Sequence, residues 1–210
     1  INAANIKLII IDEADKMLQH GFMDSFVSIF SEMPQKRTEH GIQDVQVALY
    51  SATWNDEIRN LSIKFMSNPV TILVDQEDVI QDNQKQFRVD VKTSDDKDEA
   101  LLNIFKLSNV GQVMIFCNRK TTVTYVTSLI SNLNISVGCI HSELTQDDRN
   151  LMMEKFRNGD IKILVATDVL ARGIDTVVHL VINYDIPQDV EQYVHRIGRT
   201  GRFGKEGSAL

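Results

Sequence analysis

The sequence predicts an α/β protein built on parallel sheets with helices on both faces. Short apolar runs alternate with amphipathic helical stretches along the chain, and several of these runs are continuous. A continuous run such as "LIII" at Leu8–Ile11 is typical of a parallel strand buried on both faces. Ligands of such sheets gather beyond the carboxyl ends of the strands, so polar residues directly after these runs are the first site candidates.

The elements follow in order. Helices are expected at 22–33, near 57–66, around 101–105 and 123–130, at about 146–156 and at 190–197. The helix near 146 has Thr145 as its N-cap, Asp148 at the capping-box position and Gly159 just past its end. "GSAL" at the end of the chain resembles the start of another strand. The other expected strands are "KLIIID", "VQVALYS", "VTILV", "FRVDV", "QVMIFC", "VGCIH", "IKILVAT" and "LVINYDI".

A polar segment divides the chain. "DQEDVIQDNQKQ" has neither a helical nor a strand period, which indicates a linker over 76–86 between an α/β unit at 1–75 and a second at 87–210. A long surface loop within one domain is the alternative. The segment 34–44 is expected to be a surface loop.

Composition narrows the function classes. The net charge of −7, from 22 Lys+Arg against 29 Asp+Glu, argues against a general nucleic-acid-coating protein but leaves room for a local basic groove. No apolar stretch approaches the roughly 18 residues that a membrane helix needs. Cys117 and Cys139 both lie in apolar runs and indicate buried free thiols of an intracellular, reducing compartment, cytoplasmic or nuclear.

Three acids follow the first apolar run. Asp12, Glu13 and Asp15 lie where a parallel strand ends, and carboxylates at that place suit a hard cation that carries phosphate. A solvated charged loop is the alternative. "YSAT", with Ser51 and Thr53, also ends a strand, although two hydroxyl residues there are more often a helix cap.

Two further segments combine polar groups with glycine. "VATDVLARGID" offers a hydroxyl, an arginine, a close-approach glycine and an acid after a strand, which suits phosphate and ribose contacts. In "YVHRIGRTGR", Arg199 and Arg202 are three residues apart and could converge on one polyphosphate. The alternative is a solvated basic helix end, but Gly198 and Gly201 do not favour a plain helix.

Taken together, these motifs resemble a known family. "DEAD", "SAT", "ATDVLARGID" and "HRIGRTGR", in this order and spacing, are similar to a DEAD-box ATP-dependent RNA helicase of superfamily 2, most of all its initiation-factor-4A-like subgroup. "GF" after the acids, the Gln146–Arg149 pair and "VINYDIP" agree with this resemblance, which covers nearly the whole chain. It implies two RecA-like parallel-sheet domains, the first truncated at its N-terminus.

The resemblance also implies residue roles. Asp12 would hold Mg²⁺ largely through water, with Glu13 beside it polarising the attacking water. Asp175 would meet the ATP ribose, and Arg199 and Arg202 would act as arginine fingers on the ATP phosphates. Recognition of RNA would use its backbone and 2′-hydroxyls and would be independent of sequence. Asp15, Ser51 and Thr53 would couple the phosphate state to domain closure. His195, which would also belong to the catalytic residues, and Arg196 would support the cleft between the domains. RNA would be contacted by Thr167, Arg172 and Gly173.

The sequence departs from the family pattern in two places. It contains no "GxxxxGK[ST]" phosphate cradle and no upstream adenine-reading segment, so the 210-residue chain by itself is expected to be inactive. Arg119 follows the Asn of "IFCNRKT" where the family commonly has Thr.

Three functions follow as hypotheses. The first is part of an ATP-dependent RNA helicase that uses ATP and Mg²⁺, clamps RNA and unwinds short duplexes. The second is a non-catalytic RNA-binding scaffold, and the third is a related DNA helicase. An intact acid motif with both finger arginines favours the first.

Overall fold

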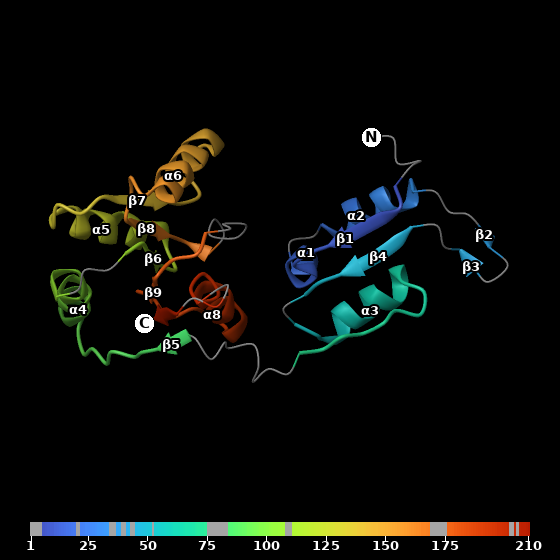
Figure 1. Ribbon diagram of the computed structural model, residues 1–210, viewed down its shortest axis with the longest axis horizontal. Helices are drawn as coiled ribbons and strands as arrows, with labels where there is room; N and C mark the ends of the chain where they lie inside the picture. Colours follow the sequence, from blue (N-terminus) through green and yellow to red (C-terminus); the bar gives the residue numbers. More distant parts are fainter. Residues whose placement is uncertain are drawn as a thin grey trace. The chain divides into compact units, whose positions relative to one another are not determined.

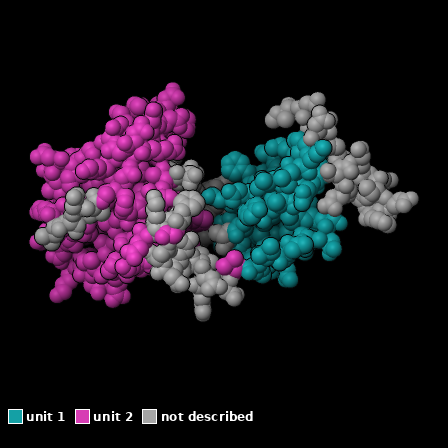
Figure 2. Space-filling view, in the orientation of Figure 1, with its two compact units in different colours: residues 1–73 teal, residues 74–210 magenta. Residues whose placement is uncertain are grey.

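The computed structural model describes residues 6–19, 22–33, 37–38, 41–42, 45–51, 53–74, 84–107, 111–168, 176–201, 204 and 206–210. The chain divides into two compact units, residues 1–73 and 74–210, which Figure 2 distinguishes by colour. Each unit is an α/β structure with parallel strand pairing, as the apolar pattern predicts. None of the described helices is long and apolar enough to cross a membrane.

The first unit contains a two-stranded parallel sheet, β1 with β4 (Figure 1). Its sheet register places Ile9 beside Val47 and Ile11 beside Leu49. These four side chains pack with apolar residues of the three helices, including buried Phe26 and Ile58. The elements are β1 (Leu8–Ile11), α1 (Ala14–Gln19), α2 (Met23–Ser31), β2 (Arg37–Thr38), β3 (Gly41–Ile42), β4 (Gln46–Leu49) and α3 (Asp56–Phe65).

Burial of this sheet differs from the prediction. Leu8 and Ile10 alternate with the buried side of β1 and are 49% and 60% exposed, so β1 is covered on one face only by the described residues. The expected strand "VTILV" is also wrong: residues 70–74 have no regular structure, and Val70 is 90% exposed. A strand needs a ladder partner, and β1 and β4 pair only with each other among the described strands. The expected loop at 34–44 contains the short antiparallel pair β2–β3.

The second unit has a six-stranded sheet in the order β5-β10-β9-β6-β8-β7, parallel throughout. β6 and β8 are buried at every position, as their continuous apolar runs predict. The elements are β5 (Gln84–Gln86), α4 (Ser94–Leu107), β6 (Val113–Phe116), α5 (Lys120–Ser131), β7 (Val137–Ile140), α6 (Gln146–Asn158), β8 (Ile163–Ala166), β9 (Leu180–Asn183), α8 (Val190–Ile197) and β10 (Gly207–Ala209) (Figure 1).

Helices cover both faces of this second sheet. One core cluster joins Met114, Phe116 and Leu164 to α6 through Phe156, and the other joins the opposite side of the strands to α4 and α5. The expected cap of α6 is confirmed: the Thr145 hydroxyl accepts a hydrogen bond from the Asp148 amide at 3.2 Å, and Gly159 ends the helix at φ +83°.

The first strand of the six-stranded sheet begins before Phe87, where strand-like alternation was expected to resume. Gln84–Gln86, assigned to the linker, form β5 and pair with Gly207–Ala209, while residues 87–91 of the expected strand "FRVDV" have no strand assignment. The physical reason is the partner strand, because the pairing of β5 with β10 extends only from Gly207 to Ala209 among the described residues.

Candidate nucleotide and nucleic-acid site

The three acids of the first unit lie directly after β1, and their exposure differs. Asp12 is exposed, Glu13 is partly exposed and Asp15 is 4% exposed. The Asp12 carboxylate accepts a hydrogen bond from the Glu13 amide at 2.9 Å. Glu13 has φ +49°, a left-handed conformation that is rare outside glycine and concentrates at functional sites. The turn therefore presents the first two acids outward and buries the third.

The buried acid meets the second motif of this unit. The Ser51 hydroxyl donates a hydrogen bond to the Asp15 carboxylate at 3.0 Å, although 36 residues separate them in sequence. The Thr53 amide lies 3.4 Å from the same hydroxyl oxygen, so Thr53 joins this cluster. The alternative role of these hydroxyls as a helix cap is not seen, because Asn55 caps α3 by accepting from the Ile58 amide. The ends of β1 and β4 are thus tied together by polar side chains.

In the second unit, Arg196 is the centre of a polar cluster. Its guanidinium is 1% exposed and makes a two-point ion pair with Asp168, with both nitrogen–oxygen distances at 2.6 Å. It also donates to the Asn118 side chain at 2.7 Å, to the Asp185 backbone carbonyl at 2.6 Å and to the Asn183 side chain at 3.3 Å. These contacts occupy all five donors of the guanidinium. Any contribution of Arg196 to coupling between domains would therefore act through Asp168 and its other partners.

Asp185 extends this cluster toward α4. Its carboxylate accepts from the Asn118 amide and forms an ion pair with Lys97, each at 2.9 Å. The Lys97 ammonium lies 4.0 Å from the centre of the Tyr184 ring. The Tyr184 hydroxyl donates to Asp98 at 2.6 Å, and burial followed by this bond raises the pKa of Tyr184. Residues of β6, β8, β9, α4 and α8 are thus joined at the carboxyl ends of the strands.

The turn after α8 carries Arg199, which is 7% exposed. Its carbonyl accepts from the Val178 amide, and the Gln84 side chain donates to the carbonyl of Ile197 at the end of α8. Gly207 allows this turn to approach β10, because an added Cβ would lie 2.2 Å from the Gly201 nitrogen. The fold therefore holds the buried Arg199 in place from two strands.

The other predicted site residues are placed in part. Thr167 follows β8 next to Asp168 and is partly buried, and His195 lies on α8, partly buried, one residue before Arg196. Four residues that were predicted to touch ribose, phosphate or RNA lie outside the described residues: Arg172, Gly173, Asp175 and Arg202. The prediction did not assign site roles to Asp168, Asn118 or Asp185, although each follows an apolar run at a strand end, which was the available signal.

The two cysteines are free, as expected, but only Cys117 is buried, and Cys139 is partly exposed. Burial first, and then the nearby Asp185 carboxylate, raise the pKa of the Cys117 thiol to about 12. Burial also raises the pKa of Cys139. Thiols held protonated in this way are poor nucleophiles, so neither cysteine is a candidate for catalysis.

The donor set for a metal is small. Among the described residues, no group of three or more His, Cys, Asp or Glu side chains could hold an ion by itself. Exposed Asp12, with Glu13 beside it, is the kind of set that Mg²⁺ uses when it keeps several waters and shares substrate phosphates. The residues present fit a nucleotide-bound magnesium ion better than a protein-enclosed one.

Comparison with known proteins agrees with these motifs. Residues 2–61 match the DEAD/DEAH box helicase family, and residues 96–204 match the helicase conserved C-terminal domain. Eukaryotic initiation factor 4A of Caenorhabditis elegans is 40% identical over the whole chain, and the ATP-dependent RNA helicase eIF4A of Meyerozyma guilliermondii is 42% identical over 98% of it. The chain spans about half the length of these relatives, 50% of each.

A solved structure shows the same similarity. It is that of Dbp5 of S. cerevisiae bound to RNA and ADP BeF3, with a TM-score of 0.84 and 34% sequence identity. The match covers the whole of this chain and 54% of the Dbp5 chain. The parallel α/β units, the tied acid and hydroxyl motifs and these matches lead to one assignment. The chain belongs to the DEAD-box helicase family and has its RecA-like fold.

Proposed function

We propose that this chain is part of an ATP-dependent RNA helicase that couples ATP hydrolysis to RNA clamping and local duplex unwinding. Residues 1–75 form the C-terminal part of the first RecA-like domain, and the second unit is the helicase C-terminal domain. The observation that carries the proposal is the Asp15–Ser51 hydrogen bond, which joins the acid and hydroxyl motifs on which nucleotide-dependent closure relies. A cellular location in the cytoplasm or nucleus goes with this function and with two free cysteines.

The first unit supplies the acids. Asp12 would hold Mg²⁺ through water, and bound Mg²⁺ would neutralise charge on the ATP phosphates. Glu13 orients the attacking water from its left-handed position. Asp15 is buried and held by Ser51, so its carboxylate can report a change at the phosphates to the segment that contains Thr53.

The second unit supplies positive charge and RNA contact. Arg199 and Arg202 stabilise the transferring phosphoryl group, a role that contributes ~10³–10⁵ in rate in comparable enzymes. His195 supports them, Asp175 binds the ribose, and Arg196 fixes the strand ends through Asp168. RNA is held along its backbone, without sequence preference, by Thr167, Arg172 and Gly173.

The 210-residue chain by itself is proposed to be inactive. Mg²⁺ bound by one or two carboxylates depends on phosphates that are already fixed, and the sequence has no glycine-rich cradle with its lysine to fix them. Weak RNA binding that falls with salt is expected to remain, because backbone contacts need no nucleotide.

The experiment measures phosphate release with saturating ATP, Mg²⁺ and single-stranded RNA, using a longer protein that carries this chain. Glu13→Gln should keep ATP binding and nearly abolish turnover, and Arg199→Ala should lower turnover by removing transition-state charge. Glu57→Gln on α3, an exposed glutamate of the same unit, is the control and should be unchanged. RNA binding without any turnover in the longer protein would favour the scaffold function instead.

A further inference from the structure

The turn that carries Arg199 is bound by a side chain of β5. The amide of Gln84, which is partly buried, donates one hydrogen bond to the Ile197 carbonyl at 2.5 Å. It donates a second to the Thr200 carbonyl at 3.3 Å. The two carbonyls lie on either side of Arg199 in the chain. Because the amide nitrogen of a glutamine has two donors, one side chain holds the turn on both sides of the buried arginine.

The register of the sheet explains why Gln84 reaches this turn. Gln84 lies opposite Gly207 of β10, and paired residues of neighbouring strands direct their side chains to the same face. Gly207 leaves that face open, since an added Cβ would lie 2.2 Å from the Gly201 nitrogen and 2.3 Å from the Thr200 hydroxyl oxygen. The glycine therefore lets the turn approach the sheet, and the neighbouring glutamine binds the turn there.

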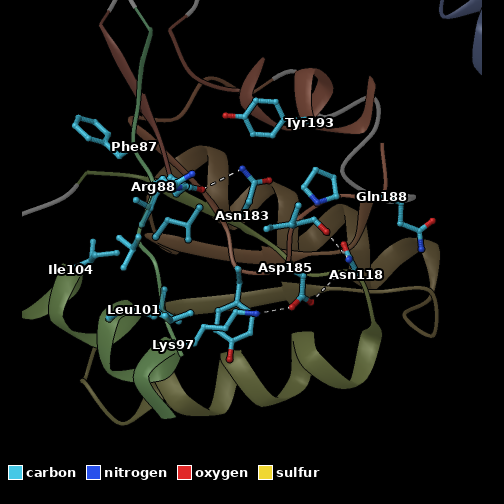
Figure 3. Close-up of a pocket in the computed structure, with 18 of the residues that line it drawn as sticks. Phe87, Arg88, Lys97, Leu101, Ile104, Asn118, Asn183, Asp185, Gln188 and Tyr193 are labelled. Carbon is cyan, nitrogen blue, oxygen red and sulfur yellow. Dashed lines mark hydrogen bonds and ion pairs between the residues drawn. The ribbon is translucent and has the colours of Figure 1, made fainter. Parts of the chain in front are cut away.

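A second glutamine of β5 binds the same helix. Side chains alternate along a strand, so Gln84 and Gln86 share one face while Lys85 points to the other. The Tyr193 hydroxyl of α8 donates to the side-chain oxygen of Gln86, and Figure 3 shows this hydroxyl directed toward the chain that follows β5. Lys85 forms an exposed ion pair with Glu206 at 3.5 Å. The two glutamines thus hold α8 at its middle and at its end.

Residues that precede β9 bind the turn as well. The Val178 amide donates to the Arg199 carbonyl at 2.8 Å. The Thr200 hydroxyl donates to the His179 carbonyl at 3.2 Å. The turn is therefore fixed from two directions. A substitution of Gln84 removes the contacts from the β5 side and leaves the backbone pairing of β5 with β10 in place.

We propose that Gln84 is a positioning residue for Arg199: its amide fixes the turn so that the Arg199 guanidinium meets the ATP phosphates in the geometry that phosphoryl transfer requires. This inference rests on the proposed function, in which Arg199 stabilises the transferring phosphoryl group. Carbonyls at the end of a helix carry partial negative charge and have no partner within the helix, so they favour an N–H donor. A displacement of about 1 Å in a reacting group can lower a rate by ~10²-fold. Gln84 therefore acts through Arg199 and not by contact with the nucleotide.

The test measures kcat and the KM for ATP of a longer protein that carries this chain, with saturating single-stranded RNA. Gln84→Met keeps the length of the side chain but removes both donors, and it should lower kcat by roughly ten- to a hundredfold. The KM for ATP should stay unchanged, because the lost interaction is one of the transition state. Gln84→Lys restores N–H donors near the helix end and should recover part of kcat. Lys85→Met places the same new side chain on the opposite face and, as the control, should keep the parental kcat.

Two further measurements separate positioning of Arg199 from a general loss of structure. In the Arg199→Ala background, Gln84→Met should lower kcat no further, because the group that Gln84 positions is gone. The Thr200 amide donates at 3.0 Å to the Ile197 carbonyl that Gln84 also binds. In the 210-residue chain, Gln84→Met should therefore speed hydrogen exchange of the Thr200 amide, followed by NMR, about tenfold, the effect of one net hydrogen bond near the upper end of the usual range. Far-UV circular dichroism checks that the second unit stays folded.

Three outcomes would overturn the role of Gln84. The first is a parental kcat in Gln84→Met, and the second is a loss of kcat that is equal in the parental and the Arg199→Ala backgrounds. The third is unchanged exchange of the Thr200 amide, which would show that the turn does not depend on Gln84. Failure of the proposed function has a different signature: Arg199→Ala alone would keep the parental turnover, and the role of Gln84 would then be lost together with that of Arg199.

Discussion

Replacing Arg196 with Ala is expected to destabilise the second unit by about 3–5 kcal/mol, the range for breaking a buried ion pair by removing one partner. The structure supports the upper part of this range. The substitution leaves the Asp168 carboxylate, whose side chain is 19% exposed, without its two-point partner. It also leaves Asn118 and the Asp185 carbonyl without a donor that lay 2.7 Å or less away. Arg196→Lys keeps the charge but has only three donors, so its free energy of unfolding should lie between those of the parent chain and of Arg196→Ala.

Urea unfolding of the 210-residue chain measures this difference by far-UV circular dichroism. Trp54 is the only tryptophan and belongs to the first unit, so its fluorescence gives an internal control that should not change. Arg88→Ala is the matched control, because the Arg88–Asp90 pair is exposed and such pairs contribute about 0–1 kcal/mol. If Arg196→Ala shifts the transition no more than Arg88→Ala does, the assignment of Arg196 as the centre of a buried cluster fails.

The remaining predictions concern the linker, the packing of β10, the buried thiol and the isolated chain. Limited proteolysis should cut before β5, between residues 75 and 84, and leave a resistant C-terminal piece; a resistant N-terminal piece would refute this. Gly207→Ala should lower the thermal midpoint of the second unit, because its Cβ would meet backbone at 2.2 Å, and an unchanged midpoint would contradict that contact. Folding raises the pKa of the Cys117 thiol from its ordinary value of 9.0 to about 12. The contribution of this thiol to the free energy of unfolding is therefore complete below pH 9.0 and is lost as the pH rises toward about 12. Urea unfolding over this pH range should show a smaller decrease of the free energy of unfolding in Cys117→Ala than in the parent chain. The 210-residue chain should show no RNA-stimulated phosphate release, and turnover that disappears with Glu13→Gln would show that it is catalytic.

Local pattern predicted most of the second unit. β6 and β8 are buried on both faces where continuous apolar runs occur, and α6 begins and ends at its predicted cap residues. These features depend on residues close in sequence or on burial alone. Asp15 and Ser51 each follow a strand that the sequence predicted, and their hydrogen bond agrees with the rule that strands of a parallel sheet end at the same edge.

The failures concern long-range partners. "VTILV" has a strand composition, but a strand forms only where another strand offers a ladder, and none of the described strands pairs with residues 70–74. The same reason leaves residues 87–91 without a strand assignment. The partners of Arg196 are also long-range, because its five donors are used by groups from 11 to 78 residues away in the same unit. No local pattern specifies such a set of partners.

We propose that this chain carries the water-orienting acid and the phosphate-binding arginines of an RNA-dependent ATPase. The most direct measurement compares phosphate release by a longer protein carrying this chain with that of its Glu13→Gln variant, each with and without single-stranded RNA. We expect turnover that rises with RNA in the parent protein and nearly vanishes in the variant, while ATP binding remains. Turnover of the variant at the parental rate would contradict it.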